Sequence, residues 1–375
     1  MVVKKFLFCI LILATLVLTS CDGQFFNWDL ERINPNDNQG AGSTSGTGGT
    51  SGSGVSSGST GAGGTVSTII NDLNQIHFVD NKIAYAVGTG VVIKSVDGGV
   101  KWVKVNTSNN LNFTAIYFVN ASIGYLGGND EYYSYLFRTL DGGLTWQQLN
   151  RYWFQNERNQ VTGVFASNSG ERIVAFINQY PNATQVYGHM VYSSNSGSTW
   201  GTMQANRRAG FNTSDLTNEN IFIGGNSYWT GTTYRTSVYV TSFLINGSPN
   251  LNEYTLLNDM DPVNFNQLDM VSNFLVGVTD KGQLAFSSDI DRQDLSFRRW
   301  PGLSATQSVS LNAIAFYDKN IGYVGMPSGK IFKTEDSGAS WSSIFQATNE
   351  VTDLGLRPDG KVFVAGKRGL IRIIN

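Results

Sequence analysis

Hydrophobic and polar residues alternate in short runs along most of this chain, from residue 66 to its end. Each run lasts about four to six positions and is broken by Gly, Asn or Asp. Alternation with a period of two is typical of strands that bury one face, and the breaking residues favour turns. We find no amphipathic pattern of helical period that lasts about three turns. The region is therefore predicted to be all-β, with short antiparallel strands.

A longer motif recurs in register within this pattern. Three segments share the form I-x-F-x-x-x-x-I-[GA]-Y: Ile76–Tyr85, Ile116–Tyr125 and Ile314–Tyr323. Each continues with a glycine turn, a short apolar run, a Lys or Arg, and an eight-residue phrase of the form [ST]-x-[DN]-x-G-x-[TSK]-W. The phrase itself is found four times, at Ser95–Trp102, Thr139–Trp146, Ser193–Trp200 and Thr334–Trp341.

Weaker copies of the motif fill the intervals, so that residues 66–375 contain seven copies of about 44 residues each. A repeat of this length with four strands is typical of one blade of a β-propeller. We therefore predict a single seven-bladed β-propeller of four-stranded antiparallel blades. The seventh copy, from Val351, supplies only three strands. The apolar segment Val66–Ile70 is expected to pair with the C-terminal strands, which would protect edges that could otherwise aggregate.

The N-terminus has the features of an export signal. Two lysines precede an apolar run, Phe6–Leu18, which is too short to span a bilayer comfortably but suits the core of a signal peptide. The run leads into Leu18–Cys21, which resembles the lipobox of bacterial lipoproteins. The resemblance implies acylation of Cys21, and ordinary secretion with cleavage nearby is the alternative. Cys9 would be removed, which would leave Cys21 as the only cysteine of the mature chain.

The lipoprotein interpretation divides the chain into four parts. Residues 1–20 are the signal peptide, 21–39 the lipidated N-terminal segment, 40–65 a tether, and 66–375 the propeller. The tether is almost entirely Gly, Ser, Thr and Ala, and we expect it to be flexible, with a typical end-to-end distance of ~25–30 Å. The expected location is the bacterial cell envelope, with the anchor at the outer membrane or cell surface in preference to the inner membrane.

The recurring phrases resemble Asp-boxes, the signature of the bacterial neuraminidase repeat. Asp-boxes also occur in sortilin-type receptors and in propellers similar to photosystem II assembly factors, and the fuller motif resembles the last group most closely. In an Asp-box a short side-chain acceptor caps a tight turn, and the Trp packs between blades. An Asn at this position in the third phrase fits an acceptor and not a proton donor. The resemblance implies structural roles for Asp97, Trp102, Asp141, Trp146, Asn195, Trp200, Asp336 and Trp341.

Sialidases share these boxes, so a glycoside hydrolase of sialidase type is one alternative. The Arg-Ile-Pro element of that family is absent, and no three arginines are singled out by their spacing. Glycoside hydrolysis needs two opposed carboxylates, and no pair stands out among the main loop carboxylates, which are Asp130, Glu131, Glu157 and Asp280. The two histidines, His77 and His189, form no common zinc arrangement without cysteines. No catalytic residue, metal or cofactor is predicted.

Binding is predicted on the face opposite the Asp-box turns. Copies two, three and four have long turns between their second and third strands, and loops carry function on propellers. These turns and the links between copies are rich in Tyr, Trp and Arg, which are enriched at binding hot spots. The candidate binding face comprises Tyr132, Tyr133, Tyr135, Arg151, Tyr152, Trp153, Tyr187, Arg207, Arg208, Tyr228 and Trp229. The structural alternative is a set of hairpin extensions whose aromatic residues pack on each other.

The expected partner is a protein of the envelope or the extracellular space, bound by a non-catalytic binding or assembly scaffold. Aromatic faces also suit sugar rings, so glycan binding is the second hypothesis and glycan cleavage the third. The chain has 26 basic and 28 acidic residues and no basic block, which argues against nucleic acid as a partner.

Overall fold

The computed structural model describes most of the chain from Ile69 onward. The described residues are 69–152, 158–182, 185–205, 209–216, 220–259, 262–272, 274–287, 296–301 and 308–374. The signal peptide, Cys21 and the tether of the sequence analysis lie outside them. Within these ranges, no helix has both the length and the apolar character needed to cross a membrane.

The described residues form antiparallel sheets, which confirms the all-β prediction. The helical elements are single turns, α1 (Phe243–Asn246) and η2 (Lys367–Gly369). The first sheet combines copies one and two, because the long β3 pairs with β2 through its first part and with β4 through its second part. Its strands are β1 (Leu73–Phe78), β2 (Ala84–Ser95), β3 (Val103–Phe118), β4 (Gly124–Asn129), β5 (Ser134–Thr139) and β6 (Gln147–Tyr152).

Each later copy forms a sheet of its own. The third copy contains β7 (Arg158–Ala166), β8 (Ile173–Asn182), β9 (Gln185–Ser193) and β10 (Gly201–Gln204). The fourth contains β11 (Phe211–Leu216), β12 (Ile221–Gly225), β13 (Tyr228–Trp229), β14 (Tyr234–Thr241) and β15 (Asn252–Asp259). The fifth contains β16 (Phe265–Val271), β17 (Phe274–Thr279), β18 (Gln283–Ser287) and β19 (Ser296–Arg299).

The sixth and seventh copies follow. The sixth contains β20 (Ala313–Phe316), β21 (Gly322–Gly325), β22 (Lys330–Thr334) and β23 (Ser342–Gln346). The seventh has three described strands, β24 (Val351–Leu356), β25 (Val362–Gly366) and β26 (Ile371–Ile374).

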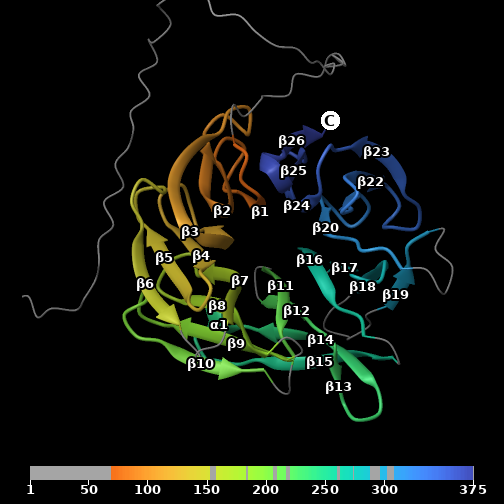
Figure 1. The fold of residues 1–375 in the computed structure, drawn as a ribbon, viewed down its shortest axis with the longest axis horizontal. Coiled ribbons are helices and arrows are strands. Elements are labelled where there is room, and N and C mark those ends of the chain that lie inside the picture. The colour runs from red at the N-terminus through yellow and green to blue at the C-terminus, as the bar shows by residue number, and fades with distance from the viewer. Residues whose placement is uncertain are drawn as a thin grey trace, which may run out of the picture.

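The sheets are arranged around a common centre, with the first copy (orange) beside the last (blue) in Figure 1. The first strand of each copy lies innermost, so that β1, the second part of β3, β7, β11, β16, β20 and β24 line one central cavity. Buried hydrophobic clusters lie between neighbouring copies, including one that joins Phe363 and Ile371 of the last copy to Leu73 and Trp102 of the first. The core is therefore divided among the junctions between copies.

Packing at these junctions explains the residues of the recurring motif. The Phe118 ring stacks on Tyr85 of the preceding copy at 3.9 Å between centroids, and it meets Trp146 edge to face at 6.1 Å. A Cβ at Gly124 would lie 2.5 Å from the Phe118 ring, and Gly322 has the same relation to the Phe of its own copy, at 2.4 Å. The small residue before the motif Tyr thus makes room for the motif Phe.

The four repeated phrases form the turns between the third and fourth strands of their copies, here called the phrase turns. Asp141 Oδ1 accepts hydrogen bonds from Thr145 N at 2.9 Å and Thr139 Oγ1 at 2.8 Å, while Gly143 N donates to Thr139 Oγ1. Asn195 Oδ1 accepts from Thr199 N at 2.8 Å, so an amide makes the same bond. Asp97 and Asp336 are bonded similarly, and four tryptophans pack between copies: Trp102, Trp146, Trp200 and Trp341.

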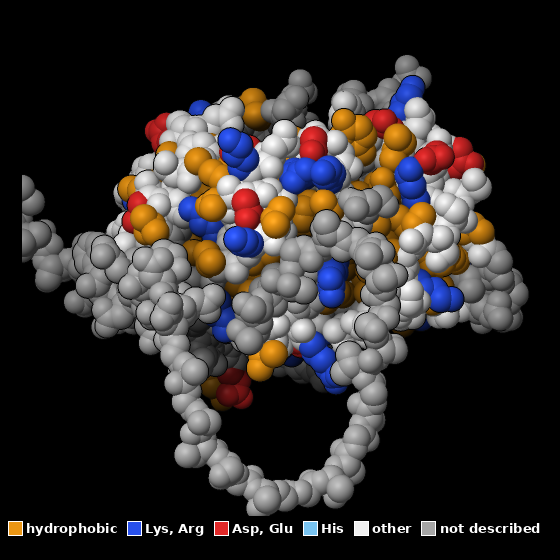
Figure 2. All heavy atoms as spheres, turned by 90° about the horizontal axis from the view of Figure 1, so that it is seen from above, with side chains coloured by type: hydrophobic (Ala, Val, Ile, Leu, Met, Phe, Trp, Pro, Cys, Tyr) orange, Lys and Arg blue, Asp and Glu red, His pale blue; other side chains and the backbone are white. Residues whose placement is uncertain are grey.

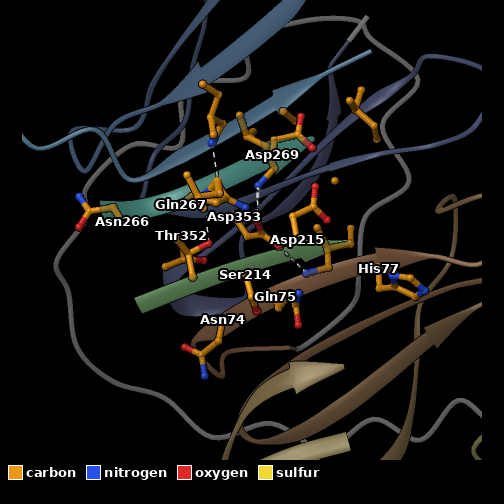
Figure 3. Close-up of a pocket in the computed structure, with 18 of the residues that line it drawn as sticks. Asn74, Gln75, His77, Ser214, Asp215, Asn266, Gln267, Asp269, Thr352 and Asp353 are labelled. Carbon is orange, nitrogen blue, oxygen red and sulfur yellow. Dashed lines mark hydrogen bonds between the residues drawn. The ribbon is translucent and has the colours of Figure 1, made fainter. Parts of the chain in front are cut away.

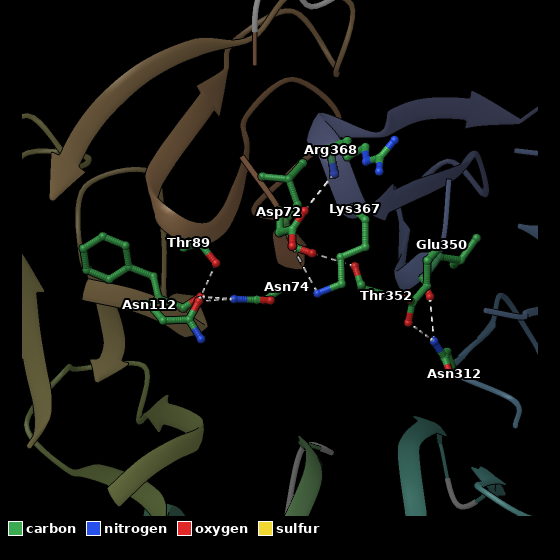
Figure 4. Close-up of polar contacts among 12 residues, drawn as sticks. Asp72, Asn74, Thr89, Asn112, Asn312, Glu350, Thr352, Lys367 and Arg368 are labelled. Carbon is green, nitrogen blue, oxygen red and sulfur yellow. Dashed lines mark hydrogen bonds and ion pairs between the residues drawn. The ribbon is translucent and has the colours of Figure 1, made fainter. Parts of the chain in front are cut away.

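The first and last copies touch directly (Figure 4). Thr352 Oγ1 in β24 donates to the Leu73 carbonyl oxygen in β1 at 2.7 Å. Beside it, Arg368 N donates to Asp72 Oδ1 at 2.9 Å, and Lys367 Nζ lies 3.4 Å from Asp72 Oδ2. Contacts of the kind that join consecutive copies therefore also join the two ends of the described chain.

The segment Val66–Ile70, predicted to be the closing strand, is described only in part. Residues 66–68 lie outside the described residues, and the last two residues of the segment belong to no strand. Ile69 is buried in the same cluster as Ile371, and Gly369 N donates to Asn71 O at 2.8 Å. The described end of the segment thus packs on the last copy, while strand pairing by residues 66–68 stays a prediction.

Candidate functional site

The turns between the second and third strands of copies two to four lie at the opposite ends of their sheets from the phrase turns. The prediction that these turns are long is wrong for copies two and three, where the strands extend and leave only residues 130–133 between β4 and β5 and residues 183–184 between β8 and β9. In copy two, β5 runs from the turn at residues 130–133 to the phrase turn that begins at Thr139. In copy three, β9 likewise leads into the phrase turn that begins at Ser193. In copy four, which has no phrase turn, α1 connects β14 to β15 at the equivalent position. The predicted binding residues and the phrase turns are therefore at different ends of the strands.

The turn of copy two exposes aromatic and basic side chains next to each other. Tyr132 is 50% exposed, and the Arg151 guanidinium lies 4.6 Å from the centre of the Tyr133 ring. Tyr135 is half-buried and donates its hydroxyl to Asp130 Oδ2 at 2.7 Å. Asp130 also accepts the backbone N–H groups of Tyr132 and Tyr133, so it orders the turn on which these rings stand.

The predicted residues of copies three and four differ in their exposure. Trp229 is 54% exposed and lies 4.9 Å from the Tyr234 ring, whereas the adjacent Tyr228 is 5% exposed and donates its hydroxyl to Glu253 Oε1 at 2.9 Å. Tyr187 is half-buried in β9. Tyr228 is therefore a core residue and presents little surface for a ligand.

Of the four remaining members of the candidate face, one packs in a junction between copies and three lie outside the described residues. Tyr152 packs edge to face on Trp200 at 6.1 Å, within the junction between copies two and three. Trp153, Arg207 and Arg208 lie outside the described residues. We use the name aromatic sector for five exposed or half-buried residues in or beside the turns between the second and third strands of copies two and four, namely Tyr132, Tyr133, Arg151, Trp229 and Tyr234. Ring contacts within each hairpin show that mutual packing, the structural alternative, also operates there.

A second candidate is the central cavity of about 340 Å³ (Figure 3). Polar side chains bridge the innermost strands around one end of it, each donating to a backbone carbonyl of the next copy. Six come from equivalent positions, namely Asn74, Thr114, Asn212, Asn266, Asn312 and Thr352. At the junction of copies three and four, Asn178 Nδ2 donates to Phe211 O at 2.7 Å. This polar collar links the innermost strands in sequence.

Three aspartates line the other part of the cavity and use both carboxyl oxygens in the same way. In Asp215, Oδ1 accepts the N–H of the following residue at 2.8 Å, and Oδ2 accepts Met270 N of the next innermost strand at 2.7 Å. In Asp353, Oδ1 accepts from Leu354 N and Oδ2 from Ile76 N, across the junction of the last and first copies. Asp269 repeats the arrangement toward the sixth copy. These carboxyl groups connect neighbouring strands.

The cavity also shifts the protonation of its ionisable groups. Burial raises the pKa of Asp353 to about 7 and that of Asp269 to about 6. Burial, together with the nearby Asp269 carboxyl, raises the pKa of Asp215 well above its usual range. Burial lowers the pKa of His77 to about 4, and its Nε2 accepts Phe118 N at 3.2 Å, which requires a neutral ring at that atom. The cavity therefore favours neutral side chains.

Sequence reasoning missed this cavity set, although a signal was available. At the inner edge of each copy an equivalent buried residue is followed by Asn or Thr, as in Leu73–Asn74, Phe113–Thr114 and Leu311–Asn312. Aligning these strands would have placed Asp215 and Asp269 in one layer. The loop carboxylates singled out instead have local roles: Asp130 caps its turn, and Asp280 accepts Asn264 N at 2.9 Å, while Glu157 lies outside the described residues.

Comparison with known proteins identifies the fold. No protein-family model matches the sequence, and no curated protein matches it. Among solved structures, the chain is similar to YCF48 bound to a D1 peptide, with a TM-score of 0.60 and 15% identity over 84% of this chain and 94% of that one. YCF48 from Cyanidioschyzon merolae gives a TM-score of 0.59 and 13% identity over 84% and 98% of the two chains. The chain folds as a β-propeller.

The similarity extends to a propeller of a different class. The WD40 β-propeller domain of Doa1 matches with a TM-score of 0.53 and 13% identity, over 83% of this chain and 95% of that one. Identities this low establish the fold and not the ligand, because one scaffold hosts many functions. The resemblance to photosystem II assembly-factor-like propellers is therefore confirmed at the level of the fold.

Proposed function

We propose that this chain is a lipid-anchored protein of the bacterial cell envelope whose closed seven-bladed propeller binds a protein partner without catalysing a reaction. The observation that carries the proposal is the aromatic sector, which exposes Tyr132, Trp229 and the paired Arg151 and Tyr133 at the ends of the sheets opposite the phrase turns. Tyr, Trp and Arg are the residues most enriched at protein-binding hot spots. A folding role alone does not require half of the Trp229 surface to face solvent.

The similar structures support a protein as the partner. One of them is YCF48 bound to a peptide, D1, so a propeller of this type does bind protein segments. The low sequence identity establishes a shared fold alone, so a protein partner for this chain is part of the proposal.

Junction contacts support a closed ring of seven copies. The polar collar passes from copy to copy, through Asn178 of β8 at the junction of copies three and four, and Thr352 returns it to Leu73. Asp353 adds a second bond from the last copy to the first, through Ile76 N at 2.8 Å.

The engagement of the cavity carboxyl groups supports a role without catalysis. Both oxygens of Asp215, Asp269 and Asp353 accept backbone N–H groups, so these residues resemble connections between strands more than an acid–base pair.

Removal of the aromatic sector should abolish partner capture and leave the fold intact. We expect a variant with Tyr132→Ala, Arg151→Ala and Trp229→Ala to lose about 100-fold or more in affinity for proteins crosslinked to the wild type in native membranes, because hot-spot residues contribute ~2 kcal/mol or more each. Ile344→Ala, at an exposed position of β23, is the control and should capture the same proteins. Unchanged capture by the triple variant would refute the proposal, and binding only to a glycan array would replace it with the glycan hypothesis.

A further inference from the structure

Two neighbouring phrase turns expose aliphatic side chains to solvent. In copy one, Val96 is 64% exposed and Val100 52%, and Val103 just beyond the turn is 58% exposed. In copy two, Leu140 is 60% exposed and Leu144 52%. We call these five residues the apolar edge. Exposed apolar residues that gather on one surface mark interaction sites more often than isolated ones do.

Folding of the phrase turns does not require these side chains. The bonds of each turn use the Ser or Thr, the Asp or Asn, and backbone groups, as in Asp141 with Thr139 and Thr145. At the positions of Leu140 and Leu144, the third phrase has Ser194 and Ser198 and makes the same turn. The geometry of the turn therefore does not explain why copies one and two have Val and Leu at these positions.

Copy one contacts the phrase turn of copy two directly, so the two parts of the apolar edge lie on adjacent copies. Lys94 Nζ and Tyr85 Oη of copy one both donate to Gly142 O of copy two, each at 2.8 Å. Lys94 is two residues from Val96, and Gly142 is two residues from both Leu140 and Leu144. The exposed Ile245 of α1 lies beyond the third copy, whose serines separate it from the edge.

Basic side chains border the apolar edge. Lys82, Lys101 and Lys104 are exposed beside it. Figure 2 shows hydrophobic side chains interspersed with basic and acidic ones on one side of the molecule. The carboxylates nearby accept hydrogen bonds or pair with a cation: Asp97 accepts Lys101 N at 2.9 Å, Asp80 accepts Lys82 N at 2.6 Å and Asp141 accepts Thr145 N at 2.9 Å. Asp359, beside the first phrase turn, pairs with Arg357 at 2.6 Å. Flexible lysines can extend past such capped carboxylates, so an approaching surface meets ammonium groups and aliphatic side chains first.

We propose that the apolar edge rests on the surface of an anionic lipid bilayer. Aliphatic side chains combined with lysines suit the headgroup region of such a membrane. Protein hot spots favour Trp, Tyr and Arg, with Leu and Val under-represented, which distinguishes this edge from the aromatic sector. The inference rests on the proposed lipid anchor, because the chain before Ile69 would hold the propeller at a high effective concentration near the bilayer.

This arrangement would fix the orientation of the propeller. The phrase turns and the turns between the second and third strands are at opposite ends of the strands, as β5 shows by connecting the turn at residues 130–133 to the phrase turn. With the apolar edge on the bilayer, the aromatic sector points away from it and toward a partner. The membrane contact would therefore present the binding face of the same protein.

The proposal can be tested on vesicles with one fluorescent position at a time. The full mature chain carries Cys21→Ser, an N-terminal hexahistidine and a single introduced cysteine, at Leu144→Cys or, as the matched control, Ser198→Cys in the third phrase turn. A nickel-chelating lipid holds the chain on vesicles of phosphatidylethanolamine and phosphatidylglycerol, and nitroxide-labelled lipids quench an environment-sensitive dye on the cysteine.

We expect strong quenching at position 144 and little at position 198, and salt should reduce the former by screening the lysines. Equal quenching at the two positions would overturn the proposal, as would the absence of quenching at 144, which is the result expected if a protein covers this edge. Because the hexahistidine replaces the lipid and no partner is present, failure of the anchor or of partner binding would not change this readout.

A second experiment tests the membrane contact without a fluorescent label. Leu140→Ser with Leu144→Ser reproduces the third phrase turn and should weaken the binding of the untethered chain to the same vesicles by about tenfold or more, since two leucines lose their burial. Ile344→Ser removes an exposed aliphatic side chain of β23 in the sixth copy and should leave vesicle binding unchanged. Equal loss in both variants would contradict a specific edge.

Discussion

Asp353→Asn should gain stability relative to the wild type as the pH rises from 5 to 8. Burial raises the pKa of the Asp353 carboxyl to about 7 in the folded state, while the unfolded value is near 3.8. The folded wild type therefore binds more protons than the unfolded chain between these values, and the stability from this group is lost as the pH rises through about 7. An Asn cannot ionise, so the stability of the variant does not fall with pH through this position.

The expected size of this relative gain is on the order of 3 kcal/mol, or roughly 6 °C in Tm, measured by thermal unfolding at both pH values. The variant carries a constant cost, because Asn offers one acceptor where Asp353 accepts from Ile76 N, Leu354 N and Gln267 Nε2. The comparison cancels the effect of His77, whose lowered pKa acts in the opposite direction in both proteins.

Asp97→Asn is the matched control for this measurement. The phrase turn of Asp97 has an Asn at the equivalent position in the third copy, and the pKa of Asp97 is lowered despite the opposing effect of burial, because backbone N–H groups bond its carboxylate. Its titration lies below pH 5, so its stability difference from the wild type should be the same at pH 5 and 8. If Asp353→Asn behaves like this control, the cavity does not hold a protonated Asp353.

Gly369→Ala should destabilise the protein by about 3 kcal/mol or more. The added methyl group would push the last copy away from residues 69–71, which lead into the first copy. Gly369 has φ of +69°, and a Cβ there would lie 1.7 Å from the Ile69 carbonyl oxygen. The left-handed backbone alone costs an Ala ~1–2 kcal/mol, and the overlap must be relieved by moving Ile69 away from its buried cluster. Thermal and denaturant unfolding would measure the loss.

Gly231→Ala separates the two contributions. Gly231 also has a positive φ, +104°, but nothing lies within 4 Å of a Cβ built there. It should therefore cost ~1–2 kcal/mol, the backbone strain only. Equal destabilisation by the two substitutions would mean that residues 69–71 do not pack on the last copy as described, and the support for a closed ring would weaken accordingly.

The fold was predictable because the motif residues repeat a packing requirement at each junction. The motif Phe, the small residue before the motif Tyr, and the phrase Trp contact each other, as Phe118, Gly124 and Trp146 do. Such short-range rules leave a pattern that can be read without coordinates. The Asn of the third phrase showed in the same way that its position needs an acceptor, and Asn195 makes that bond.

The candidate site was less predictable, because exposure depends on register. Tyr228 and Trp229 are adjacent, but pairing of β13 with β14 turns Tyr228 inward to Glu253 and leaves Trp229 outside. The cavity aspartates were missed for a related reason: Asp215 and Asp269 are 54 residues apart and meet only when the innermost strands are brought into one layer. Composition carries no information on either arrangement.

The most direct test of the central claim is photo-crosslinking in intact cells from a single position of the aromatic sector. A photoreactive amino acid replaces Trp229, and the same residue replaces Ile344 as the control on the sixth copy. The account predicts a discrete protein adduct from position 229 that is absent from position 344 and is lost when Tyr132→Ala and Arg151→Ala are added. Identical adducts from both positions, or adducts that contain glycan and no protein, would contradict it.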